Sequence, residues 1–189
     1  MAQLKLILLD FDGTLVDTRR ANAAAYIETL AEVDVTLTEK EYLEKYFGVR
    51  CIEFMQMLGF SDADQIVRLR NRKEELYPKY FDSVRVNEEL WGWCCMMRRM
   101  GVKVWIVSTG HRDNICNVMR HLNIANEVDG IICGDDVAQS KPSPEPFLEA
   151  MRRECVTAAE TIIFEDSSVG IEAARRSGAQ YVVISMEQL

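Results

Sequence analysis

Two patterns of hydrophobic positions alternate along the 189-residue chain. The first pattern consists of short apolar runs rich in β-branched residues, each followed by polar residues, which is typical of parallel strands buried on both faces. It predicts strands at residues 4–9, 102–107, 130–133, 161–164 and 181–184. Segments with helical spacing separate the later runs, at residues 111–122, 144–154 and 168–177. This alternation predicts an α/β fold with a doubly wound, mainly parallel sheet.

The second pattern covers residues 17–86 and contains only helical spacing. It predicts helices at residues 19–32, 39–47, 50–58 and 62–81, and a further helix at 87–100 leads back to the strands. A helical insert directly after the first strand indicates an α-helical cap over the sheet. We therefore divide the chain into a core, residues 1–16 and 87–189, and a cap, residues 17–86.

Charge and composition exclude several classes of partner. The chain has 22 Lys and Arg against 30 Asp and Glu, a net charge of −8, which disfavours binding to nucleic acid or to an anionic membrane. No apolar stretch approaches the ~18 residues of a membrane span, and the first apolar run is too short for a signal peptide. Six cysteines without a CxxC pair favour reduced thiols and a cytoplasmic protein. The oligomeric state stays open.

Acidic residues follow two of the predicted strands. Asp10 and Asp12 come after the first strand and point the same way, while Glu165 and Asp166 follow the fourth. Because ligands bind beyond the carboxyl ends of such strands, all four should share one edge of the sheet. Two unit charges 4 Å apart repel by about 4 kcal/mol at an effective dielectric near 20, so this cluster needs a cation. Oxygen ligands alone predict Mg²⁺ rather than zinc or copper.

Groups suited to phosphate follow the other predicted strands. Ser108 and Thr109 come after the second strand, and Lys141 lies in the loop after the third. A carboxylate beside Mg²⁺ can attack phosphorus, and its neighbour can act as the acid and base. The Lys141 ammonium, the Ser108 hydroxyl and the backbone N–H groups of Thr109 and Asp12 would offset the phosphoryl charge. Each feature alone has an ordinary explanation as a turn, cap or surface residue, but together at one sheet edge they indicate an active site.

The motifs that contain these residues resemble the four motifs of the haloacid dehalogenase (HAD) superfamily. They are DFDGTLVD at 10–17, the strand-final Ser108, KPSPEPF at 141–147 and FEDSSVGIEAA at 164–174. More narrowly, the chain is similar from about residue 4 to residue 184 to the helical-cap subfamily that includes phosphoglycolate phosphatase and β-phosphoglucomutase. Such relatives usually continue past the strand at 181–184, whereas this sequence ends at Leu189.

The resemblance implies a role for each residue. Asp10 would be the nucleophile, and Asp12 the general acid and base, with its backbone carbonyl on Mg²⁺. Ser108 and Lys141 would bind phosphoryl oxygens. The resemblance also implies that Asp166 is a direct metal ligand and that Glu165 is a metal-site partner, direct or through water. Arg50 and Lys73 lie near positions where related caps hold substrate-contacting cations, although a solvated helix cation explains each equally well.

The expected activity is hydrolysis of a small phosphorylated metabolite, a sugar phosphate or a phosphoglycolate-like compound, through an aspartyl-phosphate. Similar carbon–halogen dehalogenases lack the second aspartate, so Asp12 indicates phosphate chemistry. Asn22 stands where β-phosphoglucomutase has a histidine, and Thr14 is the phosphatase-like residue, which favours hydrolysis over a phosphosugar mutase. A receiver-like phospho-acceptor module is the alternative of another class, but it leaves Asp12 and the helical insert without a purpose.

Overall fold

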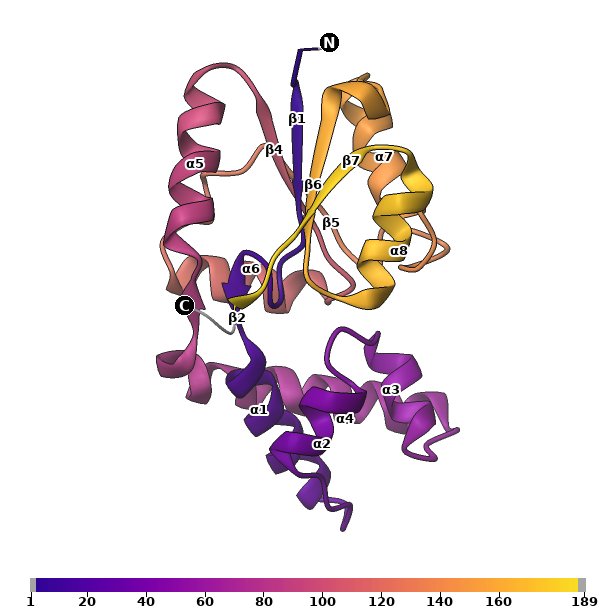
Figure 1. The fold of residues 1–189 in the computed structure, drawn as a ribbon. Helices are drawn as coiled ribbons and strands as arrows, with labels where there is room; N and C mark the ends of the chain where they lie inside the picture. The colour runs from indigo at the N-terminus through magenta and orange to yellow at the C-terminus, as the bar shows by residue number, and fades with distance from the viewer. Residues whose placement is uncertain (1–2, 187–189) are drawn as a thin grey trace.

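A five-stranded parallel sheet runs through the described part of the chain, residues 3–186 of the computed structural model (Figure 1). The strand order is β5-β4-β1-β6-β7, with every neighbouring pair parallel. The strands are β1 (Leu6–Leu9), β4 (Lys103–Val107), β5 (Gly130–Ile132), β6 (Thr161–Glu165) and β7 (Gln180–Val183). The predicted doubly wound α/β fold is confirmed, with strand ends shifted by one or two residues.

Helices cover both faces of this sheet because the side chains of β1 alternate between two cores. Ile7 and Leu9 belong to the core shared with α5 and α6, whereas Leu6 and Leu8 belong to the core shared with α7 and α8. All four side chains are fully buried. These helices are α5 (Glu88–Arg99), α6 (Arg112–His121), α7 (Glu145–Glu154) and α8 (Ser168–Ser177).

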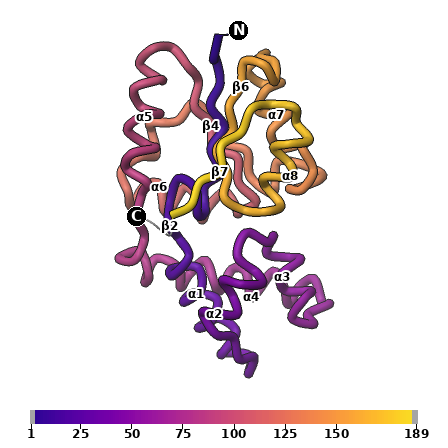
Figure 2. The backbone as a smooth tube through the Cα atoms, in the orientation of Figure 1, coloured from indigo at the N-terminus to yellow at the C-terminus, as the bar shows by residue number. Residues whose placement is uncertain are grey.

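A separate group of helices lies beyond the carboxyl ends of the strands (Figures 1 and 2). We call it the helical layer; it consists of α1 (Arg19–Ala31), α2 (Glu39–Lys45), α3 (Cys51–Met57) and α4 (Ala63–Leu76). Its own core is aromatic: the ring of Phe54 packs edge-on against Tyr26 and Tyr42, at centroid distances of 4.9 and 5.7 Å. The helical layer therefore has internal packing that does not depend on the sheet.

Two expectations about residues 17–86 were wrong in detail. The segment is not purely helical, because β2 (Val16–Asp17) pairs antiparallel with β3 (Arg85–Val86) where the chain leaves and re-enters the sheet region. Strands of two residues are too short to produce an alternating pattern. The single helix expected at 62–81 ends at Leu76 and continues as the 3₁₀ helix η1 (Tyr77–Ser83), where Pro78 lacks the N–H that an α-helix requires.

The remaining short elements complete the chain. A second 3₁₀ helix, η2 (Ala158–Glu160), leads into β6, and β7 forms one edge of the sheet. Relatives were expected to continue past the strand at 181–184. The last residues of this sequence, 187–189, lie outside the described residues. Among residues 3–186, no helix has the length and apolar character needed to cross a membrane.

Substitution of Gly130 tests the packing of the sheet. A Cβ at this position would lie about 2.5 Å from ring atoms of Trp105, whose indole N–H is fixed by a 2.7 Å hydrogen bond to Glu154. We expect Gly130→Ala to lower the free energy of unfolding in urea by about 1–3 kcal/mol. Gly92, exposed on α5 with open space around it, is the control, and Gly92→Ala should raise stability by up to about 1 kcal/mol. Equal stability of Gly130→Ala and the wild type would contradict this packing.

Candidate active site

A buried lysine joins the ends of three neighbouring strands. The Nζ of Lys141 lies 2.6 Å from Asp10 Oδ1, 2.5 Å from Glu165 Oε1 and 2.8 Å from the carbonyl oxygen of Val107. Asp10 directly follows β1, Val107 ends β4 and Glu165 ends β6. The register of the sheet places these three residues side by side, and the lysine side chain is only 1% exposed.

Burial and the neighbouring charges together set the pKa values in this group. Burial alone would lower the pKa of Lys141, but the carboxylates of Asp10 and Glu165 outweigh it and raise the pKa, so the side chain stays an ammonium. Burial raises the pKa of Asp10 against the effect of Lys141. Burial also raises the pKa of Asp166 to about 6, with a contribution from Glu165. Three carboxylates against one ammonium leave an excess of negative charge that a divalent cation would offset.

The donor set of this acidic group suits a hard cation. Asp10, Glu165 and Asp166 each offer an oxygen, and these atoms lie within 4.8 Å of one another. The oxygens of Glu165 already accept hydrogen bonds from Lys141 and from Asp166 and Ser167, which leaves Asp10 and Asp166 to face an ion. The carboxylate of Asp12 is outside this group. The predicted metal contact of Asp12 is its backbone carbonyl, which this grouping of side-chain oxygens does not test. All-oxygen coordination of this kind is typical of Mg²⁺ or Ca²⁺ rather than of softer metals.

Two glycines make room for these carboxylates. A Cβ at Gly170, the third residue of α8, would overlap the carboxylate of Glu165. Gly13 has a φ of +95°, and a Cβ there would overlap the carboxylate of Asp166, which accepts a 2.9 Å hydrogen bond from Thr14. Both glycines, one in the first motif and one in the last, therefore allow the backbone to approach a carboxylate closely.

The carboxylate of Asp12 is held by a hydrogen-bond chain from the helical layer. Asp12 Oδ1 accepts hydrogen bonds from the Thr18 hydroxyl and, at 3.2 Å, from Asn22 Nδ2. Lys73 on α4 donates a 2.7 Å hydrogen bond to Asn22 Oδ1, and its ammonium lies 3.5 Å from the centroid of the Tyr77 ring. Burial raises the pKa of Asp12 and lowers that of Lys73 to about 8. Lys73 was expected to contact the substrate. In the structure it is linked to Asp12, the predicted acid and base, through its hydrogen bond to Asn22.

Two of the predicted phosphate-binding residues, Ser108 and Thr109, directly follow β4. Ser108 is buried, and its hydroxyl oxygen accepts a 2.9 Å hydrogen bond from the Gly110 N–H, which leaves its own proton to donate. The Thr109 hydroxyl donates a 3.3 Å hydrogen bond to the carbonyl of Gly48, which lies between α2 and α3 of the helical layer. Within the described residues, the backbone N–H groups of Thr109 and Asp12 donate to no protein acceptor. Both are therefore available to a bound anion.

A cavity of about 80 Å³ lies between the helical layer and the sheet, and Asp12, Asn22 and Lys73 are among its lining residues. Arg50 does not line it. Arg50 instead donates a 2.6 Å hydrogen bond to the carbonyl of Gly134, in the loop after β5, and so links the start of α3 to the sheet. Of the two cations predicted in the cap, only Lys73 borders the cavity.

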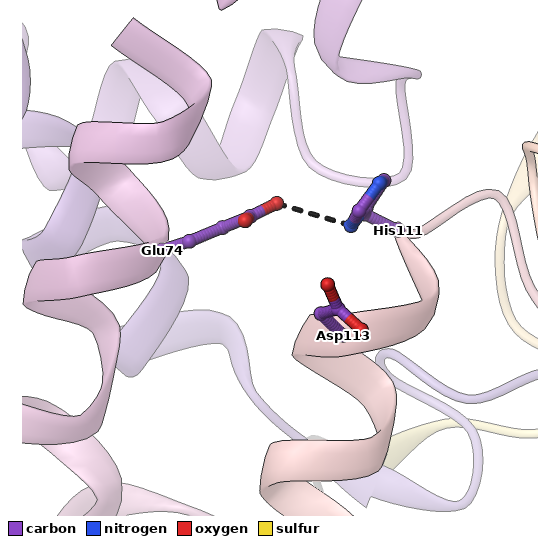
Figure 3. Close-up of side chains that lie close together, drawn as sticks. All are labelled: Glu74, His111 and Asp113. Atoms are coloured by element: carbon purple, nitrogen blue, oxygen red, sulfur yellow. Dashed lines mark ion pairs between the residues drawn. The ribbon is translucent and has the colours of Figure 1, made fainter. Parts of the chain in front are cut away.

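A polar group that borders this cavity through His111 was not predicted. Glu74 on α4 points at His111, the residue before α6, and Glu74 Oε1 lies 3.1 Å from His111 Nδ1 (Figure 3). The other ring nitrogen of His111 lies 3.3 Å from Asp135, and Asp113 stands beside the ring on α6. The sequence held a signal for α4: Arg70, Lys73, Glu74 and Tyr77 follow the i, i+3, i+4, i+7 spacing of one helix face.

Comparison with known proteins identifies the family. The family model for haloacid dehalogenase-like hydrolases matches residues 7–184. The chain belongs to this family. As a HAD-like hydrolase it is an enzyme, and the residues matched include all four motifs named above.

Three known proteins show how far the similarity of this HAD-like hydrolase extends. It is 25% identical to the fructose-1-phosphate phosphatase YqaB of Escherichia coli, over 95% of this chain and 96% of that protein. The crystal structure of CbbY from Rhodobacter sphaeroides with phosphate is 25% identical, covers 97% of this chain and 87% of that one, and superposes with a TM-score of 0.87. β-Phosphoglucomutase from Clostridium difficile is 22% identical and shares the fold at a TM-score of 0.83, over 98% of this chain and 86% of that one.

Substitution of Lys141 tests the buried charge group. Lys141→Met leaves two buried carboxylates without their counter-charge, which we expect to cost about 3–5 kcal/mol of unfolding free energy at pH 7. The pKa of Asp10 is raised in the folded protein. A carboxyl of this kind destabilises the folded protein as the pH rises through its pKa, so the loss of stability should shrink as the pH is lowered. Lys103→Met, which removes an exposed ion pair with Asp129, should cost less than about 1 kcal/mol. Similar stability of both variants at pH 7 would contradict a stabilising role for the buried ion pairs of Lys141.

Proposed function

We propose that this HAD-like hydrolase is a Mg²⁺-dependent phosphatase that hydrolyses a small phosphorylated metabolite through an aspartyl-phosphate at Asp10. The observation that carries the proposal is the position of Asp10, a buried carboxylate at a strand end beside the ammonium of Lys141. Asp166 and Glu165 complete the acidic group, and Ser108 lies at the neighbouring strand end. The phosphatase name of YqaB supports the same reaction class.

In the first step, a carboxylate oxygen of Asp10 attacks phosphorus, and the bond from phosphorus to the leaving alcohol breaks. Asp12, whose pKa is raised by burial, gives its proton to the leaving oxygen. Lys141, Ser108 and the backbone N–H of Thr109 offset the charge on the phosphoryl oxygens. Mg²⁺ held by Asp10, Asp166 and the Asp12 backbone carbonyl would supply further charge compensation on those oxygens.

In the second step, Asp12 acts as a base. Its carboxylate takes a proton from water as the water oxygen attacks phosphorus, the bond from phosphorus to Asp10 breaks, and phosphate leaves. The hydrogen bonds from Thr18 and Asn22 hold Asp12 in one position through both steps. We assign Glu165 to orienting Lys141, because hydrogen bonds occupy both of its oxygens.

The proposed function includes the division of the chain. Residues 17–86 would be the cap, and residues 1–16 and 87–189 the catalytic core. The Arg50–Gly134 and Thr109–Gly48 hydrogen bonds support a cap that closes on the core and excludes water during the reaction. All six cysteines lie in the described part of the chain and carry free thiols, which supports a reducing, cytoplasmic setting.

The two alternatives are less well supported. A phosphosugar mutase must keep its phosphoryl-enzyme long enough to return the phosphoryl group. In β-phosphoglucomutase a histidine stands at the position of Asn22, whereas in this chain the amide of Asn22 hydrogen-bonds to Asp12. A receiver-like signalling module has no use for an acid and base such as Asp12. The chain of contacts from Lys73 through Asn22 to Asp12 gives the helical insert a purpose in catalysis.

Substitution of the nucleophile tests the proposed reaction. Asp10→Asn removes the attacking carboxylate, so phosphate release from a phosphomonoester in Mg²⁺ should fall by at least about 10³-fold. Removal of divalent cations with EDTA should abolish wild-type activity, and added Mg²⁺ should restore it. Asp64→Asn, an exposed change at the start of α4, should leave activity unchanged. Full phosphate release by Asp10→Asn would overturn the mechanism.

Lys73→Met tests the link from the helical layer to Asp12. Loss of the contact with Asn22 should impair proton donation to the leaving oxygen and lower kcat by about 10–100-fold for alkyl phosphates. An aryl phosphate, whose leaving group needs little protonation, should lose much less. Lys79→Met removes an exposed lysine paired with Glu28 and serves as the control. Equal losses for alkyl and aryl phosphates would mean that Lys73 acts on something other than proton transfer.

A further inference from the structure

A histidine and two carboxylates meet at the boundary between the helical layer and the sheet. Glu74 lies on α4, whereas His111 directly precedes α6 and Asp113 lies in the first turn of α6. A ring nitrogen of His111 and one carboxylate oxygen from each acid all lie within 4.8 Å of one another. Figure 3 shows Glu74 and Asp113 approaching the His111 ring from two different helices. These three residues take no part in the reaction proposed above.

The contact between Glu74 and His111 is close, but it is not a hydrogen bond. Glu74 Oε1 lies 3.1 Å from His111 Nδ1. Within residues 3–186, both atoms are buried and neither has a hydrogen-bond partner, because their approach lacks the alignment that a hydrogen bond requires. Two ligands bound at ~2.0–2.1 Å to a tetrahedral Zn²⁺ ion lie about 3.3 Å apart. The observed spacing is therefore close to that of two atoms that share one metal ion.

The second ring nitrogen of His111 faces a third carboxylate. His111 Nε2 lies 3.3 Å from Oδ2 of Asp135, which is in the loop after β5. A carboxylate at this nitrogen favours the tautomer that carries its proton there and leaves a lone pair on Nδ1. Histidines that bind metals usually have such a partner on the nitrogen that does not bind the ion. Asp135 therefore prepares His111 Nδ1 to act as a ligand.

The charges around the imidazole of His111 favour a cation. Three carboxylates lie close to it, those of the two acids on α4 and α6 and that of Asp135. Arg112 does not neutralise them, because its guanidinium is paired with Asp136 at 2.5 Å. Arg70, one turn before the acid of α4, adds one positive charge and still leaves an excess of negative charge. A divalent ion would offset this excess.

The donor set selects a different metal from the one expected beside Asp10. The acidic group of Asp10 offers only oxygen atoms, which suit Mg²⁺ or Ca²⁺. The imidazole nitrogen of His111 instead suits zinc and its transition-metal neighbours. The side chains of His111 and Glu74 are 25% and 20% exposed, so an ion can enter from solvent and water can complete its coordination.

We propose that Glu74, His111 and Asp113 bind a divalent transition-metal ion such as Zn²⁺, at a second metal site made of other residues than the acidic group of Asp10. Glu74 belongs to the helical layer, whereas His111 and Asp113 belong to a helix that covers the sheet. The bound ion would therefore join the two layers and stabilise their closed arrangement. The site does not depend on the proposed phosphatase reaction.

Titration with Zn²⁺ in excess Mg²⁺, followed by calorimetry, tests the site directly. The wild type should bind one Zn²⁺ per chain. Glu74→Gln and His111→Gln each remove a ligand and should weaken binding by more than about 100-fold, whereas Asp135→Asn removes only the outer partner and should weaken it by about 10–100-fold. Glu75→Gln, exposed on α4, and His121→Gln, exposed at the end of α6, are the matched controls and should bind as tightly as the wild type.

Co²⁺ and thermal unfolding provide two further readouts. Co²⁺ bound by nitrogen and oxygen should give visible absorption without the near-ultraviolet thiolate band that binding to cysteines would produce, and His111→Gln should lack this absorption. Zn²⁺ at about ten times its Kd should raise the melting temperature of the wild type by about 3–5 °C and leave that of His111→Gln unchanged. Asp113→Asn, an exposed change, serves as a further ligand variant should another fail to fold.

Several results would overturn the proposal. They are absence of Zn²⁺ binding by the wild type in excess Mg²⁺, equal binding by the ligand variants and the controls, and a thiolate band in the Co²⁺ spectrum. Binding and stability are measured without substrate, so failure of the proposed phosphatase would leave this site standing. Phosphatase activity without Zn²⁺ binding would refute the site alone.

Discussion

The buried ammonium of Lys141 is the contact on which the rest of the site depends. It binds the carboxylates of Asp10 and Glu165 and the carbonyl of Val107, and so holds the ends of β1, β6 and β4 together. A carboxylate with almost no access to water is stable only when it is paired and hydrogen-bonded. The lysine therefore permits two acidic side chains to lie inside the protein, at the edge where a doubly wound sheet binds its ligands.

Other features of the fold follow from this arrangement. Gly170 leaves space at the start of α8 for the carboxylate of Glu165, and Gly13 leaves space for Asp166. Thr18 and Asn22, at the start of α1, hydrogen-bond to the carboxylate of Asp12, and Lys73 on α4 hydrogen-bonds to Asn22. The proposed nucleophile, Asp10, is thus positioned by residues at the strand ends, and the proposed acid, Asp12, by residues of the helical layer. Asp12, Asn22 and Lys73 all line the cavity between the helical layer and the sheet.

The sequence predicts best what depends on periodicity and worst what depends on contacts between distant elements. Asp10, Ser108 and Glu165 could be placed at one edge because apolar strands of buried parallel type end directly before or at them. The contact of Lys73 with Asn22 could not be predicted, because it depends on how α4 packs on α1. The short strands β2 and β3 gave no pattern, and the end of α4 at Leu76 could have been inferred from Pro78.

The central claim is that phosphoryl transfer passes through Asp10, and the stereochemical course at phosphorus tests it most directly. A phosphomonoester made chiral with oxygen isotopes would be hydrolysed in isotopically labelled water, and the configuration of the released phosphate determined by NMR. Two successive in-line displacements, first by Asp10 and then by water, predict net retention of configuration. Net inversion would mean that water attacks the substrate directly, and it would contradict the account.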